Sequence, residues 1–128
     1  MGEDFRGFLK EMEETKEGGF IRIKKEVDTR YEIAAIVTKL ERSRKVPLLL
    51  FENVKGKNMP VAVNCYATRG RVARGFGIPK QELSKRVNEA YMNPIPPAEV
   101  SSAPVQEVIL TGKDLDLRNL PAMIYHDT

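Results

Sequence analysis

Residues 47–56 read PLLLFENVKG, and this stretch carries the clearest secondary-structure signal in the chain. Its apolar run, Leu48 to Phe51, is short and bounded by turn signals, which predicts a β-strand buried on both faces. Lys55 to Asn58 predicts a turn after it. The longest apolar run, Val46 to Phe51, falls far short of the roughly 20 residues that a membrane-spanning helix needs. We therefore expect a strand of a soluble domain and no membrane partner.

Three further segments are expected to form strands. Phe20 to Lys25 alternates, with Ile21 and Ile23 on one side and basic residues on the other, which is typical of a half-buried strand. Val61 to Cys65 follows the turn. Val105 to Leu110 is another strand candidate, rich in β-branched residues.

Amphipathic helices are expected between and beside these strands. The apolar spacing predicts helices over residues 5–16 and 80–92, with a shorter helix over 69–76. Thr29 and Glu32 match a capping box that opens a further helix. The expected apolar faces are Phe5, Phe8, Leu9 and Met12; Ile33, Ile36, Val37 and Leu40; and Leu83, Val87, Ala90 and Tyr91. Asp4 and Thr68 are the expected N-caps of two of these helices, and Gly18-Gly19 are expected to end the first.

The alternation of helices and strands predicts an α/β (α+β mixed) fold, a small sheet flanked by amphipathic helices. We expect an N-terminal α/β domain over residues 1–92. Four prolines among residues 94–104 predict an extended, proline-rich linker over 93–104. The remaining stretch, 105–128, ends without a capped helix or strand.

The charge and cysteine content limit the classes of partner and compartment. Twenty-one Lys and Arg residues oppose 18 Asp and Glu residues, a net charge of +3 that is spread along the chain. A nucleic-acid-binding protein gathers its basic residues on one face, so we expect no nucleic-acid partner. Cys65 is the single cysteine and can form no internal disulfide, which favours the cytoplasm. The acidic start of the chain is not typical of a signal peptide.

Candidate catalytic and metal-binding residues are few. His126 is the only histidine and lies two residues from the last position, so it has no evident partner for acid–base catalysis. Nothing near Cys65 in the sequence would lower its pKa, so it is expected to behave as a small apolar residue. One cysteine and one histidine cannot build a zinc site, and Asp114-Leu115-Asp116 lacks the glycine and glutamate of a calcium loop. We assign no catalytic, cofactor-binding or metal-binding residue.

Three arginines at a predicted helix start remain as a candidate anion contact. Arg69, Arg71 and Arg74 lie in a stretch with several glycines, and helix N-termini favour anions. The glycine spacing matches neither a dinucleotide fingerprint nor a P-loop. If Val72 and Phe76 face the core, Arg71 and Arg74 face solvent. A solvated helix and an anion or phosphate contact both fit this pattern.

The order and spacing of many short segments resemble the N-terminal region of the UbiD-type decarboxylases. The resemblance begins near residue 4 and continues to the end of the chain. Residues 47–56 are its most specific part. The other matching segments are Asp4 to Leu9, Phe20 to Ile23, Val27-Asp28, Glu32 to Ile36, Met59 to Val61, Asn64, Thr68, Arg71 to Ala73, Ala103 to Val108, Leu115 to Leu117, and Leu120-Pro121.

The resemblance implies a chemistry for a much longer protein. Family members bind prenylated FMN, with Mn²⁺ or Mg²⁺ and K⁺. They reversibly decarboxylate aromatic, heteroaromatic or α,β-unsaturated acids, so a small carboxylic acid is the implied substrate. The Glu–Arg–Glu network and the Asn, His and Glu metal ligands of the family match no position here and would lie downstream. Residues 105–128 would lead into the flavin-binding β-barrel.

Two readings of the chain therefore stand at this point. In the first, the chain is part of a homo-oligomeric decarboxylase, needs the rest of that protein as its partner, binds no cofactor alone and is not active alone. In the alternative, it is a stand-alone accessory subunit or an anion-binding module that uses Arg69, Arg71 and Arg74.

Overall fold

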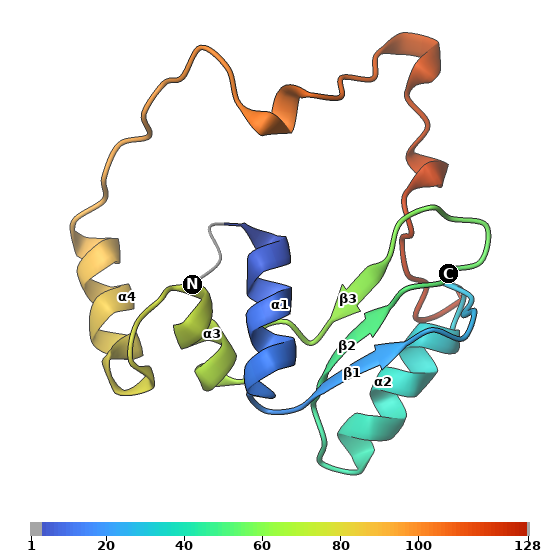
Figure 1. The fold of residues 1–128 in the computed structure, drawn as a ribbon, viewed down its shortest axis with the longest axis horizontal. Helices are drawn as coiled ribbons and strands as arrows, with labels where there is room; N and C mark the ends of the chain where they lie inside the picture. The colour runs from blue at the N-terminus through green and yellow to red at the C-terminus, as the bar shows by residue number, and fades with distance from the viewer. Residues whose placement is uncertain (1–3, 128) are drawn as a thin grey trace.

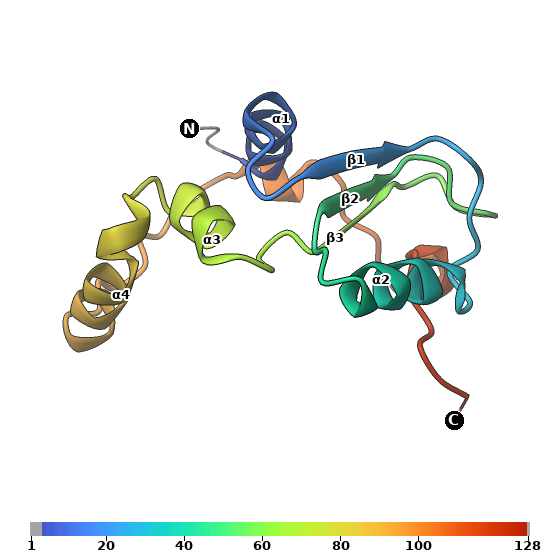
Figure 2. The ribbon, with the colours of Figure 1, turned by 90° about the horizontal axis from the view of Figure 1, so that it is seen from below.

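A mixed sheet forms the centre of the computed structural model, which describes residues 4–127 (Figure 1). The strands β1 (Phe20–Ile23), β2 (Leu48–Phe51) and β3 (Val61–Val63) lie in that order, with β1 parallel and β3 antiparallel to β2. Helix α2 (Glu32–Arg42) makes the crossover between the parallel pair. Figure 2 shows helix α1 (Phe5–Thr15) on one face of the sheet and α2 on the other. The predicted α/β class, a small sheet flanked by amphipathic helices, is confirmed.

Strand β2 is the core of the domain, as its sequence predicts. All four of its residues are buried, and Leu48, Leu49 and Phe51 are 0% exposed. Leu49 and Phe51 pack with Ile33 and Val37 of α2, whereas Leu48 packs with residues of α1 on the opposite face. Burying a side chain of this size contributes about 1.5–3 kcal/mol to folding.

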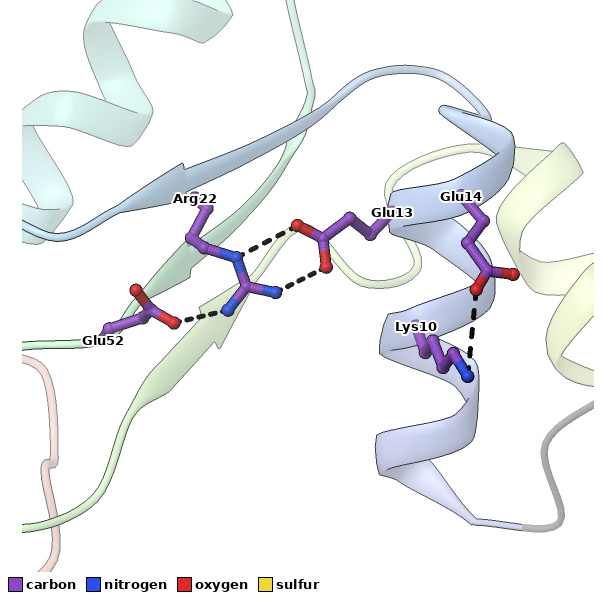
Figure 3. Close-up of polar contacts among 5 residues, drawn as sticks. All are labelled: Lys10, Glu13, Glu14, Arg22 and Glu52. Carbon is purple, nitrogen blue, oxygen red and sulfur yellow. Dashed lines mark hydrogen bonds and ion pairs between the residues drawn. The ribbon is translucent and has the colours of Figure 1, made fainter.

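Helix α1 is attached to the sheet by apolar contacts and by an ion-pair network. Phe8 and Met12 are buried against Leu48, and the Asp4 carboxylate caps the helix by accepting from the Gly7 N–H at 2.7 Å. Arg22 of β1 donates from Nε to Glu13 of α1 at 3.0 Å and also pairs with Glu52 beyond β2 (Figure 3). The hydrogen bond from Arg22 holds the pKa of Glu13 below its usual range.

The start of α2 differs from the predicted capping box. The helix begins at Glu32 after Tyr31, which has a left-handed φ of 66°. Glu32 accepts from the Asp28 N–H at 2.8 Å, and no side chain of Thr29 caps the helix. The C-terminal segment bonds to this end of the helix instead: the N–H of Tyr31 donates to the C=O of Ile124 at 3.0 Å. A contact with a residue so distant in sequence is invisible to a local capping pattern.

The other elements follow the expected order with shorter bounds. Helix α1 ends before Lys16, which adopts a φ of 55°, so the predicted Gly18-Gly19 end lies within the turn that follows. Strand β1 stops at Ile23, and Ile21 is 43% exposed because β1 lies at the sheet edge. Strand β3 stops before Asn64, whose φ is 62°. The remaining helices are α3 (Arg69–Gly75), α4 (Leu83–Met92), and the 3-10 turns η1 (Lys80–Glu82), η2 (Pro104–Gln106), η3 (Gly112–Asp114) and η4 (Leu117–Asn119).

The chain after α4 forms an arm that leaves the domain and returns to it. We call residues 93–122 the arm. Residues 93–103 form neither helix nor strand, and Figure 1 shows the arm arching over the body from α4 to the C-terminal end. It returns where Ile124 bridges Arg30 in a parallel pairing. The predicted division into 1–92, 93–104 and 105–128 stays a prediction, and its outermost residues, 1–3 and 128, lie outside the described part.

Candidate functional site

The most heavily bonded side chain of the domain is Arg71, which α3 directs inward. Thr68 caps α3 by accepting from the Arg71 N–H at 3.2 Å, so the first turn is fixed as the sequence predicts. The guanidinium of Arg71 is completely buried. It donates to backbone carbonyl oxygens from three separate segments: Glu17 at 3.1 Å, Gly18 at 2.7 Å and Gly19 at 3.4 Å; Val46 at 2.7 Å; and Asn64 at 2.7 Å.

This arrangement ties together the three loops at one end of the sheet. The acceptors lie just before β1, just before β2 and just after β3. A buried carbonyl without a donor costs free energy, and a guanidinium offers five N–H donors in a fixed plane. Burial lowers the pKa of Arg71 from its usual value, yet an arginine stays charged in proteins. Arg71 therefore supplies hydrogen-bond donors to the loop carbonyl groups at this end of the sheet, in addition to the backbone bonds of Gly19 and Asn64.

The expectation that Arg71 faces solvent is wrong. The predicted core residue Phe76 is instead 62% exposed, and Val72 is only half-buried. Helix α3 turns Gly70, Arg71 and Ala73 toward the body. The carbonyl groups of three loops converge there, and arginine can satisfy them all. An apolar-periodicity argument assigns arginine to the surface by default, which is why the sequence did not indicate this role.

Gly18 provides a direct test of how rigidly Arg71 is held. A Cβ at Gly18 would lie 2.8 Å from Nη2 of Arg71, whereas a Cβ at Gly56 would meet nothing within 4 Å. The φ values are nearly equal, +67° and +66°, so Gly18→Ala and Gly56→Ala share the left-handed strain of about 1–2 kcal/mol.

We expect Gly18→Ala to lower the free energy of unfolding by about 1–3 kcal/mol more than Gly56→Ala does, because the bonded guanidinium cannot move away freely. Urea unfolding of both variants measures the difference. Equal losses would mean that Arg71 adjusts easily and does not fix the loops.

Arg69 and Arg74 do not join Arg71 in one cationic cluster. Arg74 pairs with Glu11 at 3.1 Å and with Glu17 at 3.6 Å, and Arg69 donates to the Ser84 hydroxyl at 2.8 Å. Two of the three guanidinium groups thus face carboxylate or carbonyl oxygens of the protein. This geometry does not favour a phosphate site, and anion contact at Arg69 and Arg74 stays a prediction.

The single cysteine and the single histidine lie beside different helices: Cys65 packs against the cluster of α1, and His126 lies beside α2. Cys65 follows β3 and is half-buried, and burial raises the pKa of its thiol. A raised pKa lowers the thiolate fraction, which fits an apolar role. His126 lines an open groove of about 810 Å³ beside α2, with Tyr31 and Tyr125. Within residues 4–127, no group of three or more His, Cys, Asp or Glu side chains could hold a metal ion.

The surface that sequence reasoning missed is the apolar surface from α4 onward. Val87 and Tyr91, expected on a packed face of α4, are 50% and 83% exposed, and Leu83 alone is buried in that helix. The arm exposes large apolar residues at a higher density than the rest of the described chain. Its exposed apolar residues are Ile95, Val100, Val105, Val108, Ile109, Leu110, Leu115, Leu117 and Leu120. Large exposed apolar surfaces mark interaction sites in soluble proteins.

None of the helices formed by residues 4–127 has the length and apolar character of a membrane span. The structure thus offers a small domain whose loops are joined by Arg71, and an arm with exposed apolar side chains.

The comparisons with known proteins place this architecture. A family model described as the N-terminal domain of 3-octaprenyl-4-hydroxybenzoate carboxy-lyase, UbiD_N, matches residues 12–91. The uncharacterized protein sll0936 of Synechocystis is 32% identical over an alignment of 146 residues, covering 94% of this chain and 28% of that protein. The chain therefore spans little more than a quarter of the length of this curated relative.

Solved structures of UbiD-class enzymes share the fold. HmfF from Pelotomaculum thermopropionicum, in complex with FMN, has a TM-score of 0.72 and 32% identity, covering 93% of this chain and 27% of that enzyme. Its evolved dimeric form, in complex with prFMN, has a TM-score of 0.74 and 31% identity over 93% and 28% of the two chains. Vanillic acid decarboxylase from Sedimentibacter hydroxybenzoicus has a TM-score of 0.75 and 27% identity over 99% and 28%. The chain belongs to the UbiD family and carries the family's N-terminal domain.

Proposed function

We propose that this chain is the N-terminal part of a reversible decarboxylase that acts on aromatic, heteroaromatic or α,β-unsaturated carboxylic acids through prenylated FMN. Mn²⁺ or Mg²⁺ and K⁺ complete the proposed cofactor set. The flavin would supply the electron sink for the reaction. In this proposal the catalytic and metal-binding residues belong to the rest of the protein, as the family resemblance implies.

One observation carries the proposal. Nearly the whole chain, 93%, superposes on the enzyme HmfF with a TM-score of 0.72 and 32% identity, and that structure contains FMN. The family model matches residues 12–91, which are well under 93% of the chain. A superposition that covers 93% must therefore also include much of the arm. The likeness therefore reaches beyond a shared domain to the segment that leads away from it.

The role that we assign to this chain is to frame the enzyme. Arg71 and the core around β2 hold the small domain rigid, and the arm continues from it with its apolar side chains exposed. We propose that this region packs beside the flavin-binding domain and helps to frame the cleft that receives the acid. The alternative, a stand-alone anion-binding module, lacks a free cluster of arginines to support it.

The experiment uses the protein expressed from its complete reading frame and loaded with prFMN, Mn²⁺ and K⁺. Release of CO₂ is followed with an aromatic, a furan-type and an α,β-unsaturated acid, and with a saturated acid as the control. We expect turnover of at least one unsaturated acid, none of the saturated acid, and none by the 128-residue chain alone. A flavin-loaded protein that turns over no unsaturated acid would contradict the proposal.

Assembly and location belong to the same proposal. We infer a homo-oligomer, supported by the dimeric form recorded for one UbiD-class relative. We also infer a cytoplasmic protein, because this chain has one cysteine and so cannot form the internal disulfides that are typical of proteins in oxidising compartments.

A further inference from the structure

Residues 105–110, VQEVIL, carry a strand pattern that the structure does not realise. Apart from η2 at their start, they form neither helix nor strand, so the predicted strand Val105 to Leu110 is wrong for this chain as described. Val105, Val108 and Ile109 are 85%, 75% and 71% exposed. Strand preference depends on packing and pairing more than on the backbone itself. The sequence thus suits a strand, and the described chain offers it no partner.

The backbone of this segment is as unpaired as its side chains. Among residues 4–127, no hydrogen bond involves the N–H or C=O groups of Val108, Ile109 or Leu110. A row of free N–H and C=O groups flanked by apolar side chains is a template for an added strand. An exposed row of this kind can pair with other chains and cause aggregation, so folded proteins usually cover such an edge or interrupt it.

The segment is held in place at a distance from the body. Upstream, α4 is anchored on α3 through the buried Leu83, and downstream, Ile124 pairs with Arg30. Between them, Lys57 donates to the C=O of Arg118. Val108 and Leu110 line an open cleft of about 980 Å³ whose other wall includes Val54 and Met59. The free strand edge therefore borders a partly apolar cleft that could receive side chains of a partner.

The occupant is indicated by the length of the relatives. This chain covers only 27–28% of the UbiD-class enzymes that share its fold. The last described residues, up to Asp127, lie on the surface beside α2, so a continuing chain would be free to return toward the arm. A covalently attached partner also needs no second binding event to reach the edge.

We propose that residues 105–110 form a β-strand that pairs with the part of the protein that the relatives carry beyond the stretch matched here. This inference rests on the proposed function, since it needs the longer protein. The arm is then the strand-donating connection between the small domain and the rest of the enzyme. Pairing covers the free backbone groups on one edge, and Val108 and Leu110, which share one face of a strand, lie against the adjoining cleft.

Hydrogen exchange on the protein from its complete reading frame tests the inference. Pairing on one edge occupies alternate amides, so we expect the amide of Ile109, or those of Val108 and Leu110, to exchange at least about 100-fold more slowly than in an unstructured chain. Amides of the linker near Val100, which lies in the extended stretch, should exchange without protection. Unprotected amides at 108–110 would overturn the inference.

Proline variants make the test specific to pairing. Val108→Pro and Ile109→Pro each remove one N–H, and successive N–H groups of a strand point to opposite sides, so one of them must break a ladder bond. Val100→Pro is the matched control, because Val100 is 70% exposed and Val108 is 75% exposed. We expect one or both strand variants to speed exchange of the neighbouring amides at least about tenfold, and Val100→Pro to change them little. Strand variants that match the control would refute pairing.

Two further readouts separate the other outcomes. Protection that appears in the 128-residue chain and disappears on dilution would show that a second copy is the occupant, which overturns the inference. Decarboxylation is measured on the same full-length preparation. Activity with fast exchange at 108–110 refutes the strand and leaves the proposed function intact. Slow exchange in an inactive, flavin-loaded protein refutes the proposed function and leaves the strand intact.

Discussion

Arg71→Met is expected to lower the free energy of unfolding by about 3–5 kcal/mol, enough to unfold most of a marginally stable domain. Methionine fills much of the same space but donates nothing. The carbonyl groups of Glu17, Gly18 and Val46 would then lose their donor, whereas the C=O of Asn64 would keep the bond from the Ala67 N–H at 3.2 Å. Each such group costs about 1–3 kcal/mol, and relaxation of the loops recovers part of the sum. Circular dichroism during urea unfolding measures the loss.

Arg69→Met is the matched control, because it makes the same change two residues earlier on α3. Arg69 is exposed and has one side-chain hydrogen bond, to Ser84. Its loss should cost no more than about 1 kcal/mol. Arg71→Lys should fall between the two, since an ammonium keeps the charge but cannot reach all of the acceptors. If Arg71→Met were no more harmful than Arg69→Met, the guanidinium would not hold the loops together.

Phe51→Ala is expected to cost about 3–5 kcal/mol, the range for removing a fully buried aromatic ring. Phe51 is 0% exposed at the centre of the cluster that joins β2, β3 and α2. The surrounding residues Ile33 and Val37 come from α2 and Val61 comes from β3, and they cannot all move into the space. Urea unfolding followed by circular dichroism gives the change.

The control for this substitution is Phe76→Ala at the end of α3. Phe76 is 62% exposed, so its truncation should change the free energy of unfolding by less than about 1 kcal/mol in this chain. Similar losses for Phe51→Ala and Phe76→Ala in the 128-residue chain would contradict the assignment of β2 as the core.

The elements with strong local signals could be predicted from the sequence. Residues 48–51 formed the fully buried strand. Phe8 and Met12 of the first helix, and Ile33 and Val37 of the second, packed on the sheet as expected, whereas Phe5 is 49% exposed. The N-caps Asp4 and Thr68 were also confirmed. In each case, neighbours in the sequence determine the structure, so periodicity and capping rules were sufficient.

The failures all involve partners distant in sequence. Arg71 turned inward because loops 7 to 54 residues away present their carbonyl groups to it. The start of α2 is satisfied by Ile124 and not by Thr29. Tyr91 and residues 105–110 have apolar patterns without a packing partner among the described residues. Local patterns indicate the secondary structure that a segment favours, whereas only the tertiary structure shows which residues contact it.

The central claim is that this chain is the N-terminal part of a longer UbiD-class enzyme, and the intact mass of the natural protein tests it most directly. The protein would be isolated from its source and measured by mass spectrometry under denaturing conditions. We predict a mass several times the 14.5 kDa of the present chain, as expected if it continues for the length of its relatives. A mass of 14.5 kDa would contradict the claim and would require the catalytic part to reside on a separate chain.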